Sequence, residues 1–188
     1  MENTVFSDFE LEEIGIKFKS KDTYSSVKCV GSCEEEMEAK TITKSCRGVV
    51  VKKIVKGTGN GTLKITAHIP WAIYTEMYGM ELDTLIEGVK AYGRNSVHNN
   101  FSSTMHIKDE DGVEKYKAYP NCVISTGTVR KIENGAETVA ELELEVSVMP
   151  DEYGNGLYEA LADDLADETV KTTWMTAFTP ELVQIKSA

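Results

Sequence analysis

The sequence predicts a mainly β protein of the α+β class, in which an antiparallel β-sandwich or partly closed barrel is flanked by a helix. Three observations lead to this prediction: several segments alternate between apolar and polar residues, turn signals separate them, and stretches with helical spacing are short. With 188 residues, 41% of them hydrophobic, the chain can bury a substantial core. We therefore expect a single domain over residues 1–188, with an N-terminal arm at 1–13 and a long loop around 31–47.

The first third of the chain contains four predicted strands. Residues 14–18 and 24–30 alternate weakly, whereas residues 48–56 and 61–69 alternate more clearly. The sequence TGNG at 58–61 lies between the last two, and Asn-Gly readily supplies the positive φ angles of a tight turn. We expect a hairpin with its turn here. Because this segment leads into a strand and not into a helix, it does not predict a phosphate-binding loop.

The middle of the chain contains a predicted short helix and a second hairpin. Pro70 is tolerated in the first turn of a helix, and Gly79 marks its end. The hairpin consists of residues 101–108 and 113–124, joined by Asp-Glu-Asp-Gly at 109–112. This acidic cluster lacks the spaced ligands of a calcium loop, and Asp and Gly are common turn residues, so we interpret it as a turn.

The last third contains two predicted strands, a helix and a final strand. Residues 121–132 and 138–149 alternate, with Glu-Asn-Gly at 133–135 between them. Residues 157–168 place three leucines four positions apart opposite an acidic face, which favours a helix, and residues 172–178 favour a strand.

Three carboxylates stand out in the strand predicted at 138–149. Glu141, Glu143 and Glu145 alternate with leucine and valine, so they lie on one side of an extended chain. A catalytic pair needs two differently tuned carboxyl groups, whereas these repeat as equivalents. No G-x-S-x-G or H-E-x-x-H motif occurs either. We therefore expect no enzyme activity and no catalytic residues.

The cysteines do not predict a metal site. Three residues separate Cys29 from Cys33, a spacing that does not match the usual zinc pairs, and the three histidines are scattered. We expect these two thiols, with those of Cys46 and Cys122, to be reduced, and to behave as small buried hydrophobic side chains. No metal and no cofactor is expected.

The net charge of −11 is concentrated near the C-terminus. Residues 133–188 contain 13 acidic residues and two basic ones, Lys171 and Lys186. This distribution argues against a DNA-binding surface, which needs a basic face toward phosphate. The short basic stretch at 47–56 is interpreted as a strand with a solvated lysine side. No apolar run is long enough for a membrane span, and the start of the chain lacks the features of a secretion signal, so we expect a soluble, cytoplasmic protein without membrane contact.

Ordered blocks of sequence cover most of residues 45–184, among them CRGVVVKKIVKGTGNGTLKITAHIPWAIYTEMYGM, KDEDGVEKYKAYPNCVISTGTVRKIENG and ELELEVSVMPDEYGNGLYEAL. These blocks resemble the major tail proteins of long-tailed, non-contractile bacteriophages and prophages. The resemblance implies a tail tube subunit with a β-sandwich or barrel core flanked by a helix. Such subunits form rings, usually hexamers, that stack into a hollow conduit for DNA ejection.

The same resemblance implies the partners and the location. Other copies of the chain form the ring and stacking contacts, and the tail also contains tape-measure, baseplate or initiator, and terminator proteins. DNA passes through the lumen without sequence-specific binding. The subunit is then expected in the host cytoplasm during assembly and later in the virion tail.

Several alternatives stay open at this stage. Glu141, Glu143 and Glu145 either face the lumen, where they keep DNA phosphates off the wall, or solubilise an outer sheet face. The polar segments at 1–13 and 32–45 either become ordered on assembly or are ordinary exposed termini and loops. The protein could instead be a terminator or baseplate ring protein that does not polymerise. A carbohydrate-binding module, with Trp71, Tyr74, Tyr78 and Tyr92 as a stacking platform, is the third alternative.

Overall fold

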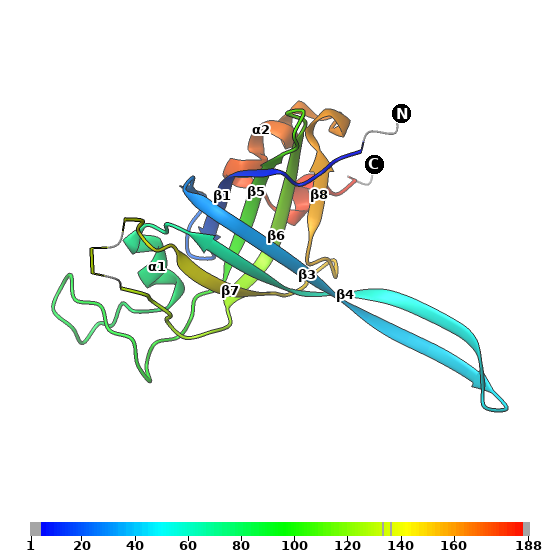
Figure 1. Ribbon diagram of the computed structural model, residues 1–188, viewed down its shortest axis with the longest axis horizontal. Coiled ribbons are helices and arrows are strands. Elements are labelled where there is room, and N and C mark those ends of the chain that lie inside the picture. Colours follow the sequence, from blue (N-terminus) through cyan, green and yellow to red (C-terminus); the bar gives the residue numbers. More distant parts are fainter. Residues whose placement is uncertain (1–4, 133, 136, 186–188) are drawn as a thin grey trace.

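The computed structural model describes residues 5–132, 134–135 and 137–185, and its main feature is an antiparallel sheet of eight strands (Figure 1). The strands are β1 (Glu10–Phe18), β2 (Ser25–Val27), β3 (Val30–Cys46), β4 (Val49–Ala67), β5 (Phe101–Lys108), β6 (Glu114–Ile124), β7 (Leu142–Val148) and β8 (Tyr158–Leu161). Their order is β2-β1-β5-β6-β7-β4-β3, and β8 pairs with β6 outside this path. Two α-helices, α1 (Trp71–Met77) and α2 (Glu168–Ala177), and two short 3-10 helices, Ala162–Asp164 and Pro180–Val183, complete the fold. The predicted mainly β, α+β class is confirmed.

The sheet brings its two ends together at one corner but does not close into a barrel. β2 pairs with residues 14–16 of β1 and leads through Lys28 and Cys29 directly into β3. In the described part of the chain, no ladder joins the rest of β1 to β3. The predicted sandwich or partly closed barrel is therefore a sheet that remains open between these two strands.

One face of the sheet carries the main hydrophobic core. Buried side chains from five strands form this cluster: Ile14, Ile16, Leu63, Ile65, Met105, Ile107, Tyr119, Leu144, Val146 and Val148. Helix α1 packs against it through Ile73, Tyr74, Met77 and Tyr78, all of which are buried.

In the described residues, no helix has the length and apolarity that a membrane span requires.

Helix α1 occupies the segment that the sequence predicts. Pro70 stands immediately before its first residue, and Gly79 follows its last turn with a φ angle of +58°. A Cβ atom on Gly79 would lie 1.9 Å from the backbone oxygen of Val97. The chain can therefore leave the helix in this direction because residue 79 has no side chain.

The β5–β6 hairpin is also confirmed. Asp109 accepts hydrogen bonds through Oδ1 from the backbone N–H groups of Asp111 (3.0 Å) and Val113 (2.7 Å), and Gly112 has a φ angle of +82°. The acidic cluster at 109–112 is thus a turn in which an aspartate side chain satisfies backbone donors.

The hairpin turn predicted at 58–61 is wrong. β3 and β4 form one long hairpin, and its turn is Arg47-Gly48, with φ angles of 51° and 81°. The glycine-rich segment lies inside β4, where pairing jumps from Gly61 opposite Met37 to Gly57 opposite Ala39. The extra residues of β4 form a bulge, and glycine accommodates the positive φ angle that a bulge can require.

Two further expectations about loops are corrected by the same strands. The expectation of a long loop around 31–47 is wrong. These residues form most of strand β3, which pairs with β4 and carries mostly exposed polar side chains. The arm expected at 1–13 overlaps β1, which begins at Glu10 and pairs with β5 from that residue on. Residues 1–4 of this arm lie outside the described residues.

The last third departs most from the sequence prediction. The strand at 121–132 ends with β6 at Ile124, and the described residues between it and Leu142, where β7 begins, are not in a strand. Strand β7 pairs mainly with residues 61–67 of β4. In the described chain, its pairing with β6 is limited to residues 122–124 of β6. The two expected strands are therefore a short β6–β7 pair, separated in the sequence by residues 125–141.

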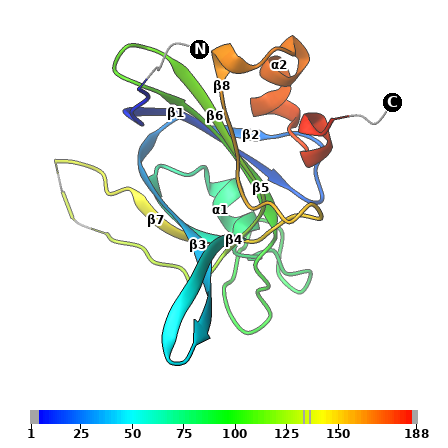
Figure 2. The same cartoon turned by 90° about the vertical axis from the view of Figure 1, so that its right-hand side faces the viewer.

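The helix predicted at 157–168 and the strand predicted at 172–178 are both wrong. Tyr158–Leu161 forms β8, which pairs with residues 115–118 of β6, and α2 follows it from residue 168. The leucine spacing favoured a helix locally, but strand pairing with β6 decides the conformation of this segment. Figure 2 shows α2 lying beside β8, against one side of the sheet.

Helix α2 is stabilised by its cap and by a second apolar cluster. The Asp167 side chain accepts a hydrogen bond from the Thr169 N–H at 2.8 Å, the usual arrangement of an N-cap. Trp174 is buried against Tyr116 and Phe178, and its Nε1–H donates to the Lys117 carbonyl at 3.1 Å. This tertiary contact, which local sequence does not reveal, selects the helix.

We predict that Trp174→Ala lowers the free energy of unfolding by about 3–5 kcal/mol, because it removes the largest side chain that α2 buries in the second apolar cluster. Thr176→Ala, on the exposed side of the same helix, should change it by less than about 0.5 kcal/mol. Urea unfolding followed by far-UV circular dichroism measures both. Equal effects of the two substitutions would contradict this description of the second cluster.

Candidate assembly surfaces

The end of the β3–β4 hairpin projects beyond the rest of the molecule (Figures 1 and 2). From Ala39 opposite Gly57 to Cys46 opposite Val49, the two strands pair with each other only, as far as the described residues show. We call residues 39–57 the hairpin arm. At about 3.4 Å per residue, its paired part is about 25 Å long. All of its residues are exposed, so the arm has two free strand edges and two free faces.

The hairpin arm is both apolar and basic. Six large aliphatic side chains are at least one-third exposed on it: Ile42, Val49, Val50, Val51, Ile54 and Val55. The arm also holds six of the 20 basic residues of the chain and none of the 31 acidic ones. Exposed aliphatic residues in this number are unusual on a solvated strand pair, and they are typical of a surface that another protein covers.

A second surface is acidic and lies on the outer face of β3, β4 and β7. The alternation predicted for the glutamate strand is confirmed: Glu143 and Glu145 are exposed, whereas the intervening side chains of β7 are buried. Strand pairing places Lys64 between Glu34 and Glu145, with 3.9 Å between Lys64 Nζ and Glu34 Oε2. A groove of about 300 Å³ runs across this face.

Glu141 is also exposed, but it has a different neighbour. It precedes β7, and its carboxylate lies against Gly31, where an added Cβ would be 2.1 Å from Glu141 Oε2. The structure thus places Glu143 and Glu145 together along the groove, and places the Glu141 carboxylate beside Gly31. The described residues contain no group of three or more side chains placed to hold a metal ion.

The four aromatic residues of the alternative carbohydrate platform do not form an exposed surface together. Tyr74 and Tyr78 are buried in the main core, whereas Trp71 and Tyr92 are about half exposed. Arg130, which sequence analysis missed, lies 4.2 Å from the ring centroid of Tyr74 and donates from Nε to its hydroxyl at 3.1 Å. These rings anchor the segment that precedes β7 to helix α1.

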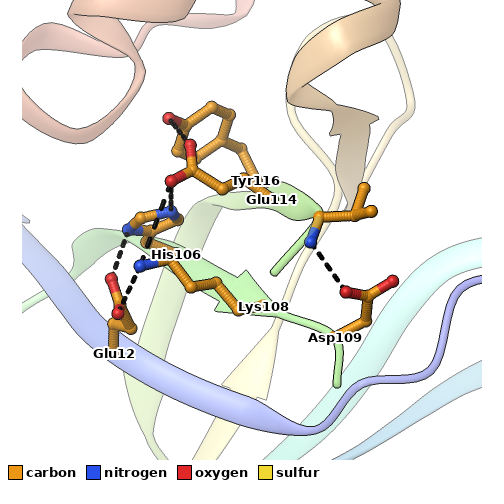
Figure 3. Close-up of polar contacts among 7 residues, drawn as sticks. Glu12, His106, Lys108, Asp109, Glu114 and Tyr116 are labelled. Atoms are coloured by element: carbon orange, nitrogen blue, oxygen red, sulfur yellow. Dashed lines mark hydrogen bonds and ion pairs between the residues drawn. The ribbon is translucent and has the colours of Figure 1, made fainter. Parts of the chain in front are cut away.

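A cluster of charged side chains connects β1 to β5 and β6 on the outer side of the sheet (Figure 3). Glu12 is 2.5 Å from Lys108 Nζ and 3.3 Å from His106 Nδ1. Glu114 lies 3.7 Å from His106 Nε2 and accepts a hydrogen bond from the Tyr116 hydroxyl at 3.4 Å. Sequence analysis did not detect this cluster, because its members are scattered along the chain and meet only through strand pairing.

The four cysteines have different surroundings, and none is in a disulfide. Cys122 is buried, as expected, and burial raises the pKa of its thiol. Burial also raises the pKa of the Cys33 thiol to about 12. Cys29 and Cys46 are exposed, so the expectation that they are buried is wrong. Cys46 is exposed because it lies at the end of the hairpin arm.

No protein-family model matches the chain, and no curated protein sequence does. Solved structures that are similar over most of the chain include the following three. A protein in the tube-terminating cap of the anti-feeding prophage has 8% identity and a TM-score of 0.49, covering 86% of this chain and 96% of its own. A protein in the baseplate of the same prophage has 9% identity and a TM-score of 0.46, with 85% and 97% covered.

The third is in the sheath–tube complex of an extracellular contractile injection system, PVC, in its extended state. It has 9% identity and a TM-score of 0.49, with 86% of this chain and 94% of that chain covered. At these identities and scores, the similarities do not assign a function to this chain.

The Glu12–Lys108 contact predicts a pH dependence of stability. The hydrogen bond between the two groups lowers the pKa of Glu12 and raises the pKa of Lys108. A lowered carboxyl pKa contributes stability above the unfolded value of about 4.5, and this contribution is lost as the pH falls through the folded value. For Lys108, the contribution is present below about pH 10.5 and is lost at higher pH.

We therefore expect Glu12→Gln to lose less stability than the natural chain between pH 6 and pH 3. Urea unfolding at each pH measures this difference. Glu110→Gln, in the exposed β5–β6 turn, is the matched control and should follow the natural chain. If both variants follow the natural chain, the contact does not contribute to folding.

Proposed function

We propose that this protein is a structural, non-enzymatic subunit of a phage-type tail tube. In this proposal it forms rings, hexamers by the sequence resemblance, that stack into a hollow conduit for DNA. The single observation that carries the proposal is the hairpin arm, with its exposed aliphatic residues and free strand edges. The resemblance of residues 45–184 to major tail proteins supports it independently.

The physical argument starts from the cost of such an arm in a monomer. Free strand edges and exposed aliphatic side chains promote association, and soluble monomers usually cover or shorten them. Here the two strands extend about 25 Å beyond their other partners. An arm of this kind is useful when another copy of the chain supplies the missing contacts, as strands do when they add to a neighbouring sheet.

The proposal also includes the partners and location that the resemblance implies. Self-association builds the tube. Its length is set by other tail proteins, namely the tape-measure, baseplate or initiator, and terminator proteins. The protein is then made and assembled in the host cytoplasm and becomes part of the virion tail. DNA crosses the lumen without sequence-specific contacts.

We predict that Val55→Asp weakens self-association at least about 10-fold, because a carboxylate buried without a partner is unfavourable. Val89→Asp is the matched control: Val55 is 58% exposed and Val89 is 52% exposed, but Val89 lies outside the arm. Circular dichroism should show that both variants are folded. Sedimentation and negative-stain electron microscopy, on dilute and concentrated protein, measure assembly.

The images also separate the proposed function from its alternative. Rings that stack into hollow tubes support a tube subunit, and closed rings that never stack favour a terminator or baseplate ring protein. Protein that forms neither rings nor tubes, even when mixed with the initiating proteins of a tail, would contradict the proposal.

The acidic outer face has a place in the same proposal. If β7 lines the lumen, Glu143 and Glu145 repeat around every ring, with Glu141 near one end of the strand. Like charges would then repel DNA phosphates over the screening length of about 8–10 Å at physiological salt. The duplex would slide along the wall instead of adhering to it.

A triple variant tests this placement of the glutamates. In the triple variant Glu141→Lys, Glu143→Lys and Glu145→Lys, tubes should form normally but retain DNA. Delivery of DNA through the tail should then fall at least about 10-fold. Lysine at Glu159, Asp163 and Asp164 makes the same change in charge away from β7 and is the control. Normal delivery through normal tubes of the triple variant would place these glutamates outside the lumen.

A further inference from the structure

The open part of the sheet forms a slot between β1 and β3. Residues 10–13 of β1 pair with β5 on one side, and residues 30–35 of β3 pair with β4 on one side. Their other edges face each other across two cavities of about 520 and 440 Å³. We call this feature the β1–β3 slot. Its two walls are strand edges that lack ladder partners in the described chain, and strand edges accept further strands.

The β1–β3 slot has an acidic mouth and a floor that contains both apolar and charged side chains. Glu10, Glu12 and Glu13 line the outer cavity, where Lys28 is the basic residue among the lining side chains that the structure describes. Leu11, Met105 and Ile107 line the inner cavity. The slot therefore offers an extended segment three things: backbone groups, carboxylates at the entrance and hydrophobic contacts below them.

Buried polar groups fix the depth of the slot. Lys117 lies at the inner cavity, where its Nζ is 3.3 Å from Glu35 and 3.8 Å from Asp8. The Tyr119 hydroxyl donates to Glu35 from the same side. These charges pair with each other, and Glu12 at the mouth already pairs with Lys108 and His106, so the carboxylates that remain for an incoming strand are Glu10 and Glu13.

The hairpin arm has the complementary properties. It is already extended, it has free edges, it exposes six aliphatic side chains, and it carries six basic residues without an acidic one. The remainder of the chain has 14 basic and 31 acidic residues, so the arm is a positive element on a negative molecule. Opposite charge steers two such surfaces together and aligns them.

We propose that the hairpin arm of one copy docks into the β1–β3 slot of the next copy. A strand edge of the arm pairs with a slot edge, its aliphatic residues cover the floor, and its lysines meet the glutamates at the mouth. This inference rests on the proposed self-assembly and names the two surfaces that carry it. The groove over β4 and β7 is also acidic, but its strands are paired with each other, so it offers a face and not a free edge.

The position of the two surfaces decides what kind of assembly results. The slot lies at the start of β3, and the arm contains the end of β3. Donor and acceptor are therefore different surfaces at opposite ends of one strand. Such head-to-tail contacts give closed rings when the rotation closes and filaments when it does not.

Zero-length cross-linking tests the contact directly. A carbodiimide joins lysine amines to carboxylates that touch them, and a mixture of ¹⁴N- and ¹⁵N-labelled protein identifies the links between copies. In concentrated or assembled protein, we expect mixed-isotope links from Lys52 or Lys53 to Glu10 or Glu13. Links from the arm to other carboxylates, such as Glu143 or Glu145, would overturn the proposal, and so would the absence of any link from the arm.

Charge exchange provides a second, independent test. Lys52→Glu with Lys53→Glu reverses two charges on the arm, and Glu10→Lys with Glu13→Lys reverses two charges at the mouth of the slot. Each double variant alone should self-associate at least about 10-fold more weakly, and an equal mixture of the two should recover the natural affinity. Mass photometry and sedimentation velocity over a range of concentrations measure this recovery.

The control for the exchange reverses two aspartates elsewhere. Asp163→Lys with Asp164→Lys makes the same change in charge on the 3-10 helix before α2, away from the slot. This variant should self-associate normally, and mixing it with the arm variant should not restore rings. An effect as large as that of the slot variant would overturn the proposal. If normal tubes form but the arm cross-links to residues outside the slot, the proposed function is supported and the proposed arm–slot contact is wrong.

Discussion

The continuous pairing of β3 with β4 is the constraint on which the rest of the structure depends. At its inner end, this ladder contributes Leu63, Ile65 and Ala67 to the main core, so its direction is set by packing. At its outer end, the same two strands continue into solvent as the hairpin arm. A hairpin anchored in a core is stiffer than a free loop, because its backbone groups are already paired. The arm can therefore meet a partner without first becoming ordered.

The position of β3 also explains why the sheet stays open. β2 joins β1 at one corner, but β3 then follows β4 outward, away from the start of β1. A barrel would need the free edge of β3 to pair with β1, and the described residues contain no such ladder. The cluster of Glu12, His106 and Lys108 holds β1 to β5 on the other side. The arm and the slot are thus two consequences of one strand path.

Charge is separated along this path in a way that composition alone does not show. The net charge of −11 conceals a hairpin arm with six basic residues and no acidic one. Taken along the sequence, the arm is a short basic strand of ordinary appearance. In space, it is a positive element that projects from a negative body. In the proposed self-association, the arm supplies the basic surface, so the rate and specificity of assembly should depend on salt.

The sequence by itself determined the class of the fold, helix α1, the β5–β6 hairpin and the alternation of Glu143 and Glu145, because these follow from side-chain periodicity and turn chemistry. Only the tertiary structure decided that residues 158–161 are a strand, that residues 168–177 are a helix, and that the hairpin turn is Arg47-Gly48. Pairing with β6, the burial of Trp174 and a bulge at the glycine-rich segment override the local signals. The hairpin arm and the slot were not predictable for the same reason, because a free strand edge is defined by which strands lie beside it.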